Sequence, residues 1–180
     1  MSRLAPIRLD QTLAVVIPSY KVLAHVLDVI GRIGPEVAMI FVVDDACPEG
    51  SGKHVEEKCS DPRVRVIRHA QNKGVGGAVM TGYQAALAAG ADVIVKLDGD
   101  GQMDPALIGR IARPVLEGRA DYAKGNRFHS IWNVRKMPAL RLRGNAALSF
   151  VTKLSSGYWS LFDPTNGYTA INRDALERME

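Results

Sequence analysis

Hydrophobic residues in this chain form short continuous runs that alternate with amphipathic segments. The runs predict buried strands over residues 12–17, 37–43, 64–67, 92–97, 121–124 and 169–171. Between them, helical spacing predicts helices over residues 21–32, 53–59, 78–89, 104–117 and 137–156, and Asn172 is predicted to cap a last helix. Continuous apolar strands that alternate with helices are typical of a parallel sheet buried on both sides. The predicted fold class is therefore α/β, a mostly parallel sheet with helices on both faces.

Polar side chains follow four of the predicted strands, at the point where each strand ends. They are Ser19 and Tyr20 after the first, Asp44 and Asp45 after the second, Asp98 to Gln102 after the fourth, and Arg127 after the fifth. In open parallel sheets, ligands bind beyond the carboxyl ends of the strands. Each of these polar groups alone could belong to a turn, but four at one edge of a sheet predict a shared site.

The segment after the fourth strand carries oxygen-bearing side chains at alternate positions. Asp98, Asp100 and Gln102 are separated by single glycines, which let the backbone curl so that the three can face one point. Such oxygens suit Mg²⁺ or Mn²⁺, whose other positions are filled by water and substrate phosphates. The pattern predicts a metal site that holds a nucleoside diphosphate. The alternative is an acidic turn that closes the strand and caps the next helix through Asp104.

The composition fits one globular domain over residues 1–180, with 47% hydrophobic and 23% charged residues. No apolar run reaches the length of about 18 residues that a bilayer requires, and the start of the chain lacks a signal-peptide core. Cys47 and Cys59 have neither metal-type nor redox-type spacing, as expected in a reducing compartment. The chain is expected to be cytoplasmic. Its end just after the Asn172 cap indicates a shortened form of a longer protein.

Basic residues gather in one part of the sequence, although the net charge is only +4. Arg135, Lys136, Arg141 and Arg143 fall close together beside Trp132. Such a patch suits nucleic acid, anionic lipid head groups or a phosphorylated substrate. A solvated loop and helix face is the alternative.

Several common site motifs are absent. The glycines of residues 74–77 suggest a dinucleotide fingerprint, but its third glycine would stand at position 79, where the chain has Val79. There is no P-loop pattern and no serine in a Gly-x-Ser-x-Gly elbow. The four histidines lack metal-type spacing and are expected to be surface or packing residues.

Two other functions compete with a metal-dependent transfer. Asp98-Gly99-Asp100-Gly101 resembles the Asp-x-Asp-Gly-Thr opening of haloacid dehalogenase-like phosphatases, with Asp98 as the group that would be phosphorylated. Against this, Gln102 replaces the expected Thr or Val, and the segment follows the fourth strand instead of the first. The second alternative is a nucleotide-sugar binding domain that has the pocket but no turnover.

Six segments, taken in order, resemble family 2 glycosyltransferases, and are most similar to the dolichol- and polyprenyl-phosphate sugar synthases. They are residues 16–20 (VIPSY), 42–45 (VVDD), 72–78 (NKGVGGA), 98–102 (DGDGQ), 125–127 (GNR) and 163–168 (DPTNGY). The resemblance implies a GT-A (Rossmann-like) fold and an inverting transfer from a UDP- or GDP-sugar to a polyprenyl or dolichyl phosphate. Ala46-Cys47-Pro48 departs from the Gly-Ser that usually follows the acidic pair in this family.

The resemblance also implies roles for individual residues. The nucleotide sugar would be bound by Pro18, Ser19, Tyr20, Asp44, Asp45, Lys73, Asp98 and Gly99, and Mg²⁺ or Mn²⁺ by Asp98, Asp100 and Gln102. Catalytic roles are implied for Asp100, Arg127 and Asp163, and acceptor-phosphate binding for Arg141 and Arg143. A lipid phosphate is mostly ionised near neutral pH, with a second pKa of about 6 by analogy with phosphorylated side chains, so no dedicated base is required. Nucleic acid is not an expected partner. A longer protein would meet the cytoplasmic face of a membrane near or beyond residue 180.

Overall fold

The computed structural model describes residues 11–126 and 166–179. The chain divides into two compact units, Met1–Ala123 with Tyr168–Glu180, and Lys124–Gly167. The fold below is that of the first unit. The helix predicted over residues 137–156 lies outside the described residues, and one domain over residues 1–180 stays a prediction.

The observed strands agree with the predicted strands, and the largest differences from the prediction are at the starts of two helices. In chain order they are β1 (Leu13–Ser19), α1 (Val26–Gly31), β2 (Met39–Asp44), α2 (Ser51–Lys58), β3 (Val64–Arg68), α3 (Gly74–Ala88), β4 (Val93–Lys96), the 3-10 helix η1 (Pro105–Leu107), α4 (Ile108–Leu116), β5 (Tyr122–Lys124), β6 (Thr169–Asn172) and α7 (Arg173–Glu177). Each predicted strand lies within two residues of its expected bounds.

The two helix starts differ for local reasons. The helix predicted from residue 21 begins at Val26, because Lys21 has a left-handed backbone with φ of 57°. The helix predicted from residue 78 begins at Gly74. There the Asn72 side chain accepts the Gly74 N–H at 3.0 Å, so the helix start has a local acceptor that offsets the low helix propensity of glycine.

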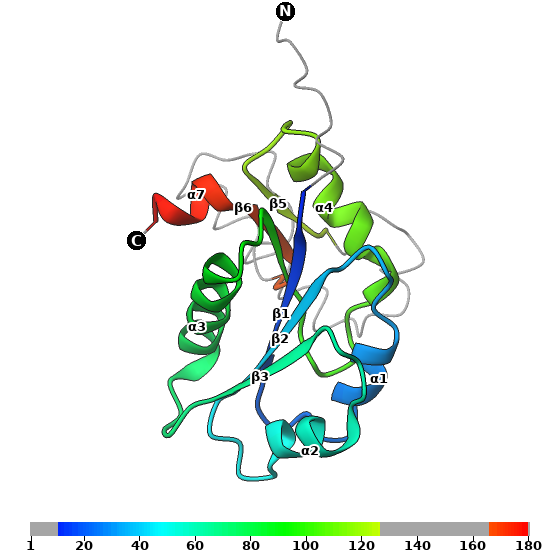
Figure 1. Ribbon diagram of the computed structural model, residues 1–180, viewed down its shortest axis with the longest axis vertical. Helices are drawn as coiled ribbons and strands as arrows, with labels where there is room; N and C mark the ends of the chain where they lie inside the picture. Colours follow the sequence, from blue (N-terminus) through cyan, green and yellow to red (C-terminus); the bar gives the residue numbers. More distant parts are fainter. Residues whose placement is uncertain (1–10, 127–165, 180) are drawn as a thin grey trace, which may run out of the picture. The chain divides into compact units, whose positions relative to one another are not determined.

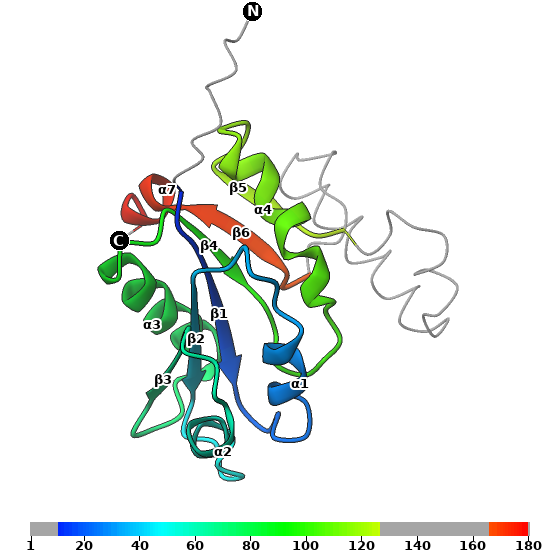
Figure 2. The same ribbon diagram turned by 45° about the vertical axis from the view of Figure 1, so that its right-hand side comes forward.

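The strands form a six-stranded sheet in the order β3-β2-β1-β4-β6-β5. β1 runs parallel to β2 and β4, β2 runs parallel to β3, and β6 runs antiparallel to β4. Figures 1 and 2 show α3 against one face and α1 and α4 against the other. The mostly parallel α/β sheet with helices on both faces is thus confirmed.

The core lies in two layers because the inner strands are apolar on both sides. Along β1, Val15 and Ile17 pack with the cluster that includes residues of α1 and α4, whereas Val16 packs with the cluster that includes α3. All three are fully buried. Because β1, β2 and β4 are parallel, their carboxyl ends meet at one edge of the sheet. Among the described residues, no helix is long and apolar enough to cross a bilayer.

Candidate active site

An open pocket of ≈ 440 Å³ lies at the carboxyl ends of β1, β2 and β4. Residues 18–22 line it from the end of β1 and the loop that follows, Asp45 from just after β2, and residues 98–100 from the loop after β4. The start of α3 closes another side through Gly74, Val75 and Ala78. The ends of β1, β2 and β4 therefore meet at one pocket, whereas Arg127, the fourth polar group of the predicted shared site, lies outside the described residues.

The predicted site residues fall into three groups. Pro18, Ser19, Tyr20, Asp45, Asp98, Gly99 and Asp100 line the pocket. Asp44, Lys73 and Gln102 are not among its lining residues. Arg127, Arg141, Arg143 and Asp163 lie outside the described residues, so their roles stay predictions.

Asp44 serves the loop before α2. Its Oδ1 accepts the Cys47 N–H at 2.7 Å and its Oδ2 accepts the Gly52 N–H at 2.9 Å. A side chain at Gly52 would overlap this carboxylate, so the close approach requires glycine. Asp44 ends β2, whereas Asp45 is the first residue after the strand, and only Asp45 lines the pocket. The predicted nucleoside contact therefore fits Asp45 better than Asp44.

Asp45 is a buried carboxylate at the pocket, with an exposed fraction of 2%. Its Oδ1 accepts the Lys73 N–H at 2.8 Å and lies 2.7 Å from His69 Nδ1. Burial alone would raise the pKa of Asp45, but hydrogen bonds from the Lys73 N–H, the His69 ring and the Gly74 N–H outweigh it. The pKa of Asp45 therefore lies below its ordinary value of 3.8, and the group is ionised at neutral pH.

His69 forms a hydrogen bond to the Asp45 carboxylate. Because an ionised carboxylate only accepts, His69 donates from Nδ1 to Asp45. Its Nε2 lies 2.9 Å from Thr81 Oγ1 on α3, and the His69 side chain is only 5% exposed. The expectation of a surface or packing residue missed this contact. One signal was available, since His69 directly follows β3, the strand beside β2.

Lys73 contributes its backbone to the site. It stands at the N-cap of α3, and its N–H binds Asp45. The predicted nucleotide contact of its side chain stays a prediction.

Two of the three predicted metal ligands come together in the pocket. Asp98 and Asp100 both line it. Gln102 is exposed, and its N–H donates to Asp100 Oδ1 at 3.0 Å. Among the described residues, no group of three or more His, Cys, Asp or Glu side chains forms a metal cage. Two carboxylates still fit Mg²⁺ or Mn²⁺, since Mg²⁺ in particular commonly binds one or two carboxylates together with substrate phosphates and water.

Asp98 also has a basic neighbour that sequence reasoning missed. Lys96, the last residue of β4, forms an ion pair with Asp98 Oδ1. The signal was a lysine within an otherwise apolar strand, two positions before the first acid.

Ser19 offers an unused polar atom at the pocket. It is fully buried and lines the pocket. Its Oγ has no hydrogen-bond partner among the described residues. A buried hydroxyl without a partner is costly, so a ligand that bonds to Ser19 would remove that cost.

The pocket rim is partly apolar. Tyr20 is 44% exposed and Val75 64% exposed, and the Lys21 ammonium lies 5.5 Å from the centre of the Tyr20 ring. Flat apolar surface beside buried polar groups suits a nucleoside, whose base has an aromatic face and polar edges.

The chain matches the family model of glycosyl transferase family 2 over residues 14–179. It is 30% identical to the UDP-N-acetylglucosamine–dolichyl-phosphate N-acetylglucosaminyltransferase of Methanococcus voltae, with 93% of this chain and 72% of that protein covered. It is 33% identical to the polyprenol monophosphomannose synthase of Mycolicibacterium smegmatis, with 98% of this chain and 67% of that protein covered.

Solved structures agree on the fold. Glucosyl-3-phosphoglycerate synthase from Mycobacterium tuberculosis, in complex with Mn²⁺, UDP and glucosyl-3-phosphoglycerate, superposes with a TM-score of 0.68 at 20% identity and covers 92% of this chain. Mannosyl-3-phosphoglycerate synthase from Rubrobacter xylanophilus gives a TM-score of 0.69 at 18% identity, also over 92% of this chain. The chain spans only 58% and 54% of those two proteins. With the fold and the family match together, the chain belongs to glycosyl transferase family 2 and is a glycosyltransferase of the GT-A fold.

Proposed function

We propose that the chain transfers a sugar from a UDP- or GDP-sugar to a polyprenyl or dolichyl phosphate, with Mg²⁺ or Mn²⁺ bound at the site. The observation that carries this proposal is the meeting of Asp98 and Asp100 with Tyr20 and Asp45 in one pocket. Asp98 and Asp100 suit a cation with a diphosphate, and Tyr20 and Asp45 suit a nucleoside.

The donor is the better supported half of the proposal. Tyr20 and Val75 offer the base an apolar surface, and the ionised Asp45 accepts N–H or O–H groups of the base or ribose. The structural neighbour from M. tuberculosis was solved with Mn²⁺ and UDP. Which nucleotide binds here depends on the hydrogen-bonding edge of the base that meets Asp45 and Ser19.

Catalysis would depend on charge at the leaving group. When bound, a divalent cation supplies Lewis-acid stabilisation of the negative charge on the departing diphosphate. Asp98 and Asp100, which both line the pocket, would hold that cation.

The acceptor class follows from the curated relatives. Two of them are named for transfer to dolichyl phosphate and to undecaprenyl phosphate, and a third is a polyprenol monophosphomannose synthase. A phosphate oxygen attacks without a dedicated base because it is mostly ionised near neutral pH. Arg141 and Arg143 stay predicted to bind this phosphate, Arg127 to add a cation near the phosphates, and Asp163 to shape the sugar or acceptor side.

A soluble phosphorylated acceptor is a second candidate. It is favoured by the structural neighbours, which are named for 3-phosphoglycerate products. Both candidates offer an anionic oxygen to the same donor site, so they differ only on the acceptor side. The phosphatase and the domain without turnover are not favoured, because the family and its named relatives are glycosyltransferases.

The proposal is tested first at Asp100. Calorimetric titration of UDP and of GDP, each with and without Mn²⁺, is expected to show one nucleotide whose affinity rises with the metal. In Asp100→Ala the metal-dependent part should fall by at least about tenfold, equivalent to about 1.4 kcal/mol. Asp28→Ala is the matched control, since that side chain on α1 is 72% exposed and outside the pocket.

The outcomes are distinct. Equal nucleotide affinity with and without Mn²⁺ in the unchanged protein would contradict the proposal. Transfer assays with a polyprenyl phosphate and with 3-phosphoglycerate then separate the two acceptor classes, and the proposal expects product only with the lipid.

A further inference from the structure

Lys96 is a buried cation attached to a predicted metal ligand. Its side chain is 11% exposed, and its ammonium pairs with Oδ1 of Asp98. In the described part of the chain, Asp98 is the only acid with which Lys96 is paired. Asp98 itself is 29% exposed and lines the pocket. The pair therefore lies between the sheet and the ligand space.

The sheet fixes where Lys96 can reach. It stands opposite Val16 of β1 and Thr169 of β6, so strands flank it on both sides. The preceding residues of β4 are fully apolar and buried, and Lys96 is the one charge of the strand. A buried ammonium is costly unless it is paired. The sheet thus holds the Lys96 ammonium where it pairs with the Asp98 carboxylate.

This arrangement conflicts with a metal bound alone. A divalent cation on Asp98 would share one carboxylate with the Lys96 ammonium. Two cations bound to the same carboxylate repel each other. A nucleoside diphosphate brings negative charge to the same place and attracts both. The local charge around Asp98 therefore favours the metal more strongly when the diphosphate is present.

We propose that Lys96 acts as a resident cation on Asp98 that couples metal binding to nucleotide binding. Without nucleotide, Lys96 lowers the affinity of Asp98 and Asp100 for a divalent cation. With nucleotide, the diphosphate offsets the repulsion and the metal binds tightly. By linkage, the metal raises the nucleotide affinity by the same factor. This inference rests on the proposed function, because it assumes that the metal and the nucleotide share the pocket.

The test removes the charge and measures the metal. Mn²⁺ affinity is determined by calorimetry for the protein alone and with saturating UDP or GDP. Lys96→Met is the main variant, because methionine keeps the apolar stem without the ammonium. We expect its nucleotide-free Mn²⁺ affinity to rise about tenfold, equivalent to about 1.4 kcal/mol. The tightening of Mn²⁺ by nucleotide should shrink by a similar factor.

Three further variants make the result specific. Lys96→Arg keeps the charge and should retain the coupling of the unchanged protein. Lys53→Met removes a lysine that is 66% exposed on α2, and should leave Mn²⁺ binding unchanged. Lys96→Gln is a second charge-free variant for use if the methionine form does not fold, as judged by circular dichroism and a cooperative thermal transition. It should show the same gain in metal affinity.

The outcomes separate this inference from the proposed function. If neither Lys96→Met nor Lys96→Gln gains nucleotide-free Mn²⁺ affinity, the role of Lys96 is overturned while the metal site stands. If the unchanged protein binds no Mn²⁺ even with UDP or GDP, the proposed function fails and the inference fails with it.

Discussion

Asp45 shows at a single residue how the site holds a buried charge. Desolvation raises the pKa of its carboxyl, but hydrogen bonds from the Lys73 N–H and the His69 ring lower it further than burial raises it. Lys73 stands at the N-cap of α3, so the ionised Asp45 also places a negative charge where the helix dipole favours one. The same carboxylate serves both the helix and the pocket.

The lowered pKa of Asp45 predicts a pH dependence of stability. Because the folded-state pKa is below 3.8, the ionised group stabilises the fold above that pH, and this contribution is lost as the pH falls through the lowered value. Asp45→Asn is expected to cost about 1–3 kcal/mol at pH 5 and less at pH 3. Urea unfolding of both proteins at the two pH values measures this. A cost that does not change with pH would contradict the pKa direction.

At this scale the sequence predicted part of the site. The spacing of Asp98 and Asp100 predicted that they share a site, and both line the pocket together with Asp45. The choice between Asp44 and Asp45 required the loop hydrogen bonds, which sequence spacing does not contain. For His69, the position just after a strand was the one available signal, but its partners lie 24 and 12 residues away in the chain, so spacing could not name them.

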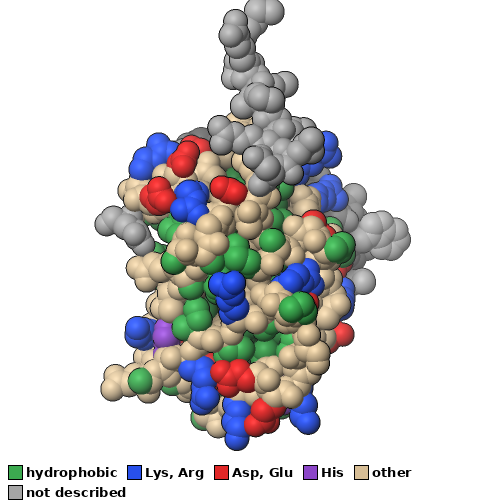
Figure 3. Space-filling model, in the orientation of Figure 1, with side chains coloured by type: hydrophobic (Ala, Val, Ile, Leu, Met, Phe, Trp, Pro, Cys, Tyr) green, Lys and Arg blue, Asp and Glu red, His purple; other side chains and the backbone are tan. Residues whose placement is uncertain are grey.

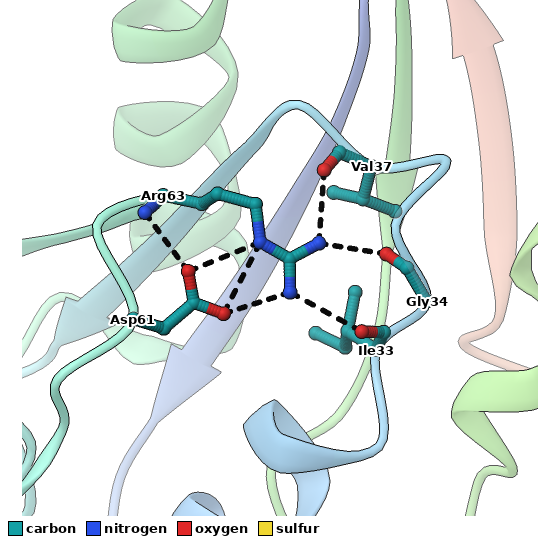
Figure 4. A network of polar contacts seen from close by, with 5 residues as sticks. All are labelled: Ile33, Gly34, Val37, Asp61 and Arg63. Atoms are coloured by element: carbon teal, nitrogen blue, oxygen red, sulfur yellow. Dashed lines mark hydrogen bonds and ion pairs between the residues drawn. The ribbon is translucent and has the colours of Figure 1, made fainter.

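At the scale of elements, Arg63 joins the loop between α1 and β2 to the loop before β3 (Figure 4). The guanidinium of Arg63 donates to the carbonyls of Gly34 at 2.7 Å, Val37 at 3.0 Å and Ile33 at 3.2 Å. Asp61 accepts from Nε at 3.0 Å and from Nη2 at 2.7 Å, which orients the planar group. The segment between α1 and β2 is thus tied to the segment before β3.

Replacing Arg63 should destabilise the fold without touching the pocket. Arg63→Ala leaves three carbonyls without their donor, and we expect a loss of about 2–3 kcal/mol in the free energy of unfolding by urea. Arg63→Lys should recover only part of it, because an ammonium lacks the planar fork. The matched control is Arg113→Ala, because the Arg113 side chain is 71% exposed on α4 although it pairs with Glu117, and this change should be nearly neutral. A neutral Arg63→Ala would show that these bonds do not hold the loops together.

Helix α3 lies unusually close to β1. A Cβ at Gly82 would collide with the side chain of Val16 and lie 3.2 Å from Val43. Gly82→Ala should therefore destabilise the protein by about 1–3 kcal/mol through overpacking, although alanine favours helices. Gly76→Ala in the same helix meets nothing within 4 Å, so it should be neutral or slightly stabilising. Thermal unfolding of both variants checks this, and equal effects would contradict the close approach.

The strands were the predictable elements, because short continuous apolar runs that are bounded by turn residues, such as residues 12–17, are typical of strands buried on both faces of a sheet. The helix starts were not, since they depend on single backbone and capping features. Lys21 with its positive φ delays α1, and the Asn72 side chain lets α3 include a glycine run. Both features depend on contacts and dihedral angles that periodicity does not encode.

For the whole molecule, the surface charge around α2 indicates no binding partner. Figure 3 shows basic and acidic side chains side by side at the end where α2 lies in Figure 1. Lys53 pairs with Glu57 there, and Arg68 with Glu56. The net charge of +4 thus makes no basic surface around α2. The basic residues from Arg135 to Arg143 lie outside the described residues, so the acceptor side rests on the prediction.

The mostly parallel sheet and the strand-end site could be predicted for a physical reason. Parallel strands bring their carboxyl ends to one edge, so polar residues that are distant in sequence must meet there. The identity of the nucleotide, sugar and acceptor could not be predicted, because these depend on the shape of the pocket and on side chains that meet the ligand from several elements.

Anomalous diffraction from a crystal of this protein with Mn²⁺ and UDP or GDP tests the central claim most directly. The account predicts a manganese peak bonded to oxygens of Asp98 and Asp100, with the nucleotide diphosphate on its other side and the base near Tyr20 and Asp45. A manganese peak elsewhere, or a nucleotide bound in this pocket with no metal at those two carboxylates, would contradict it.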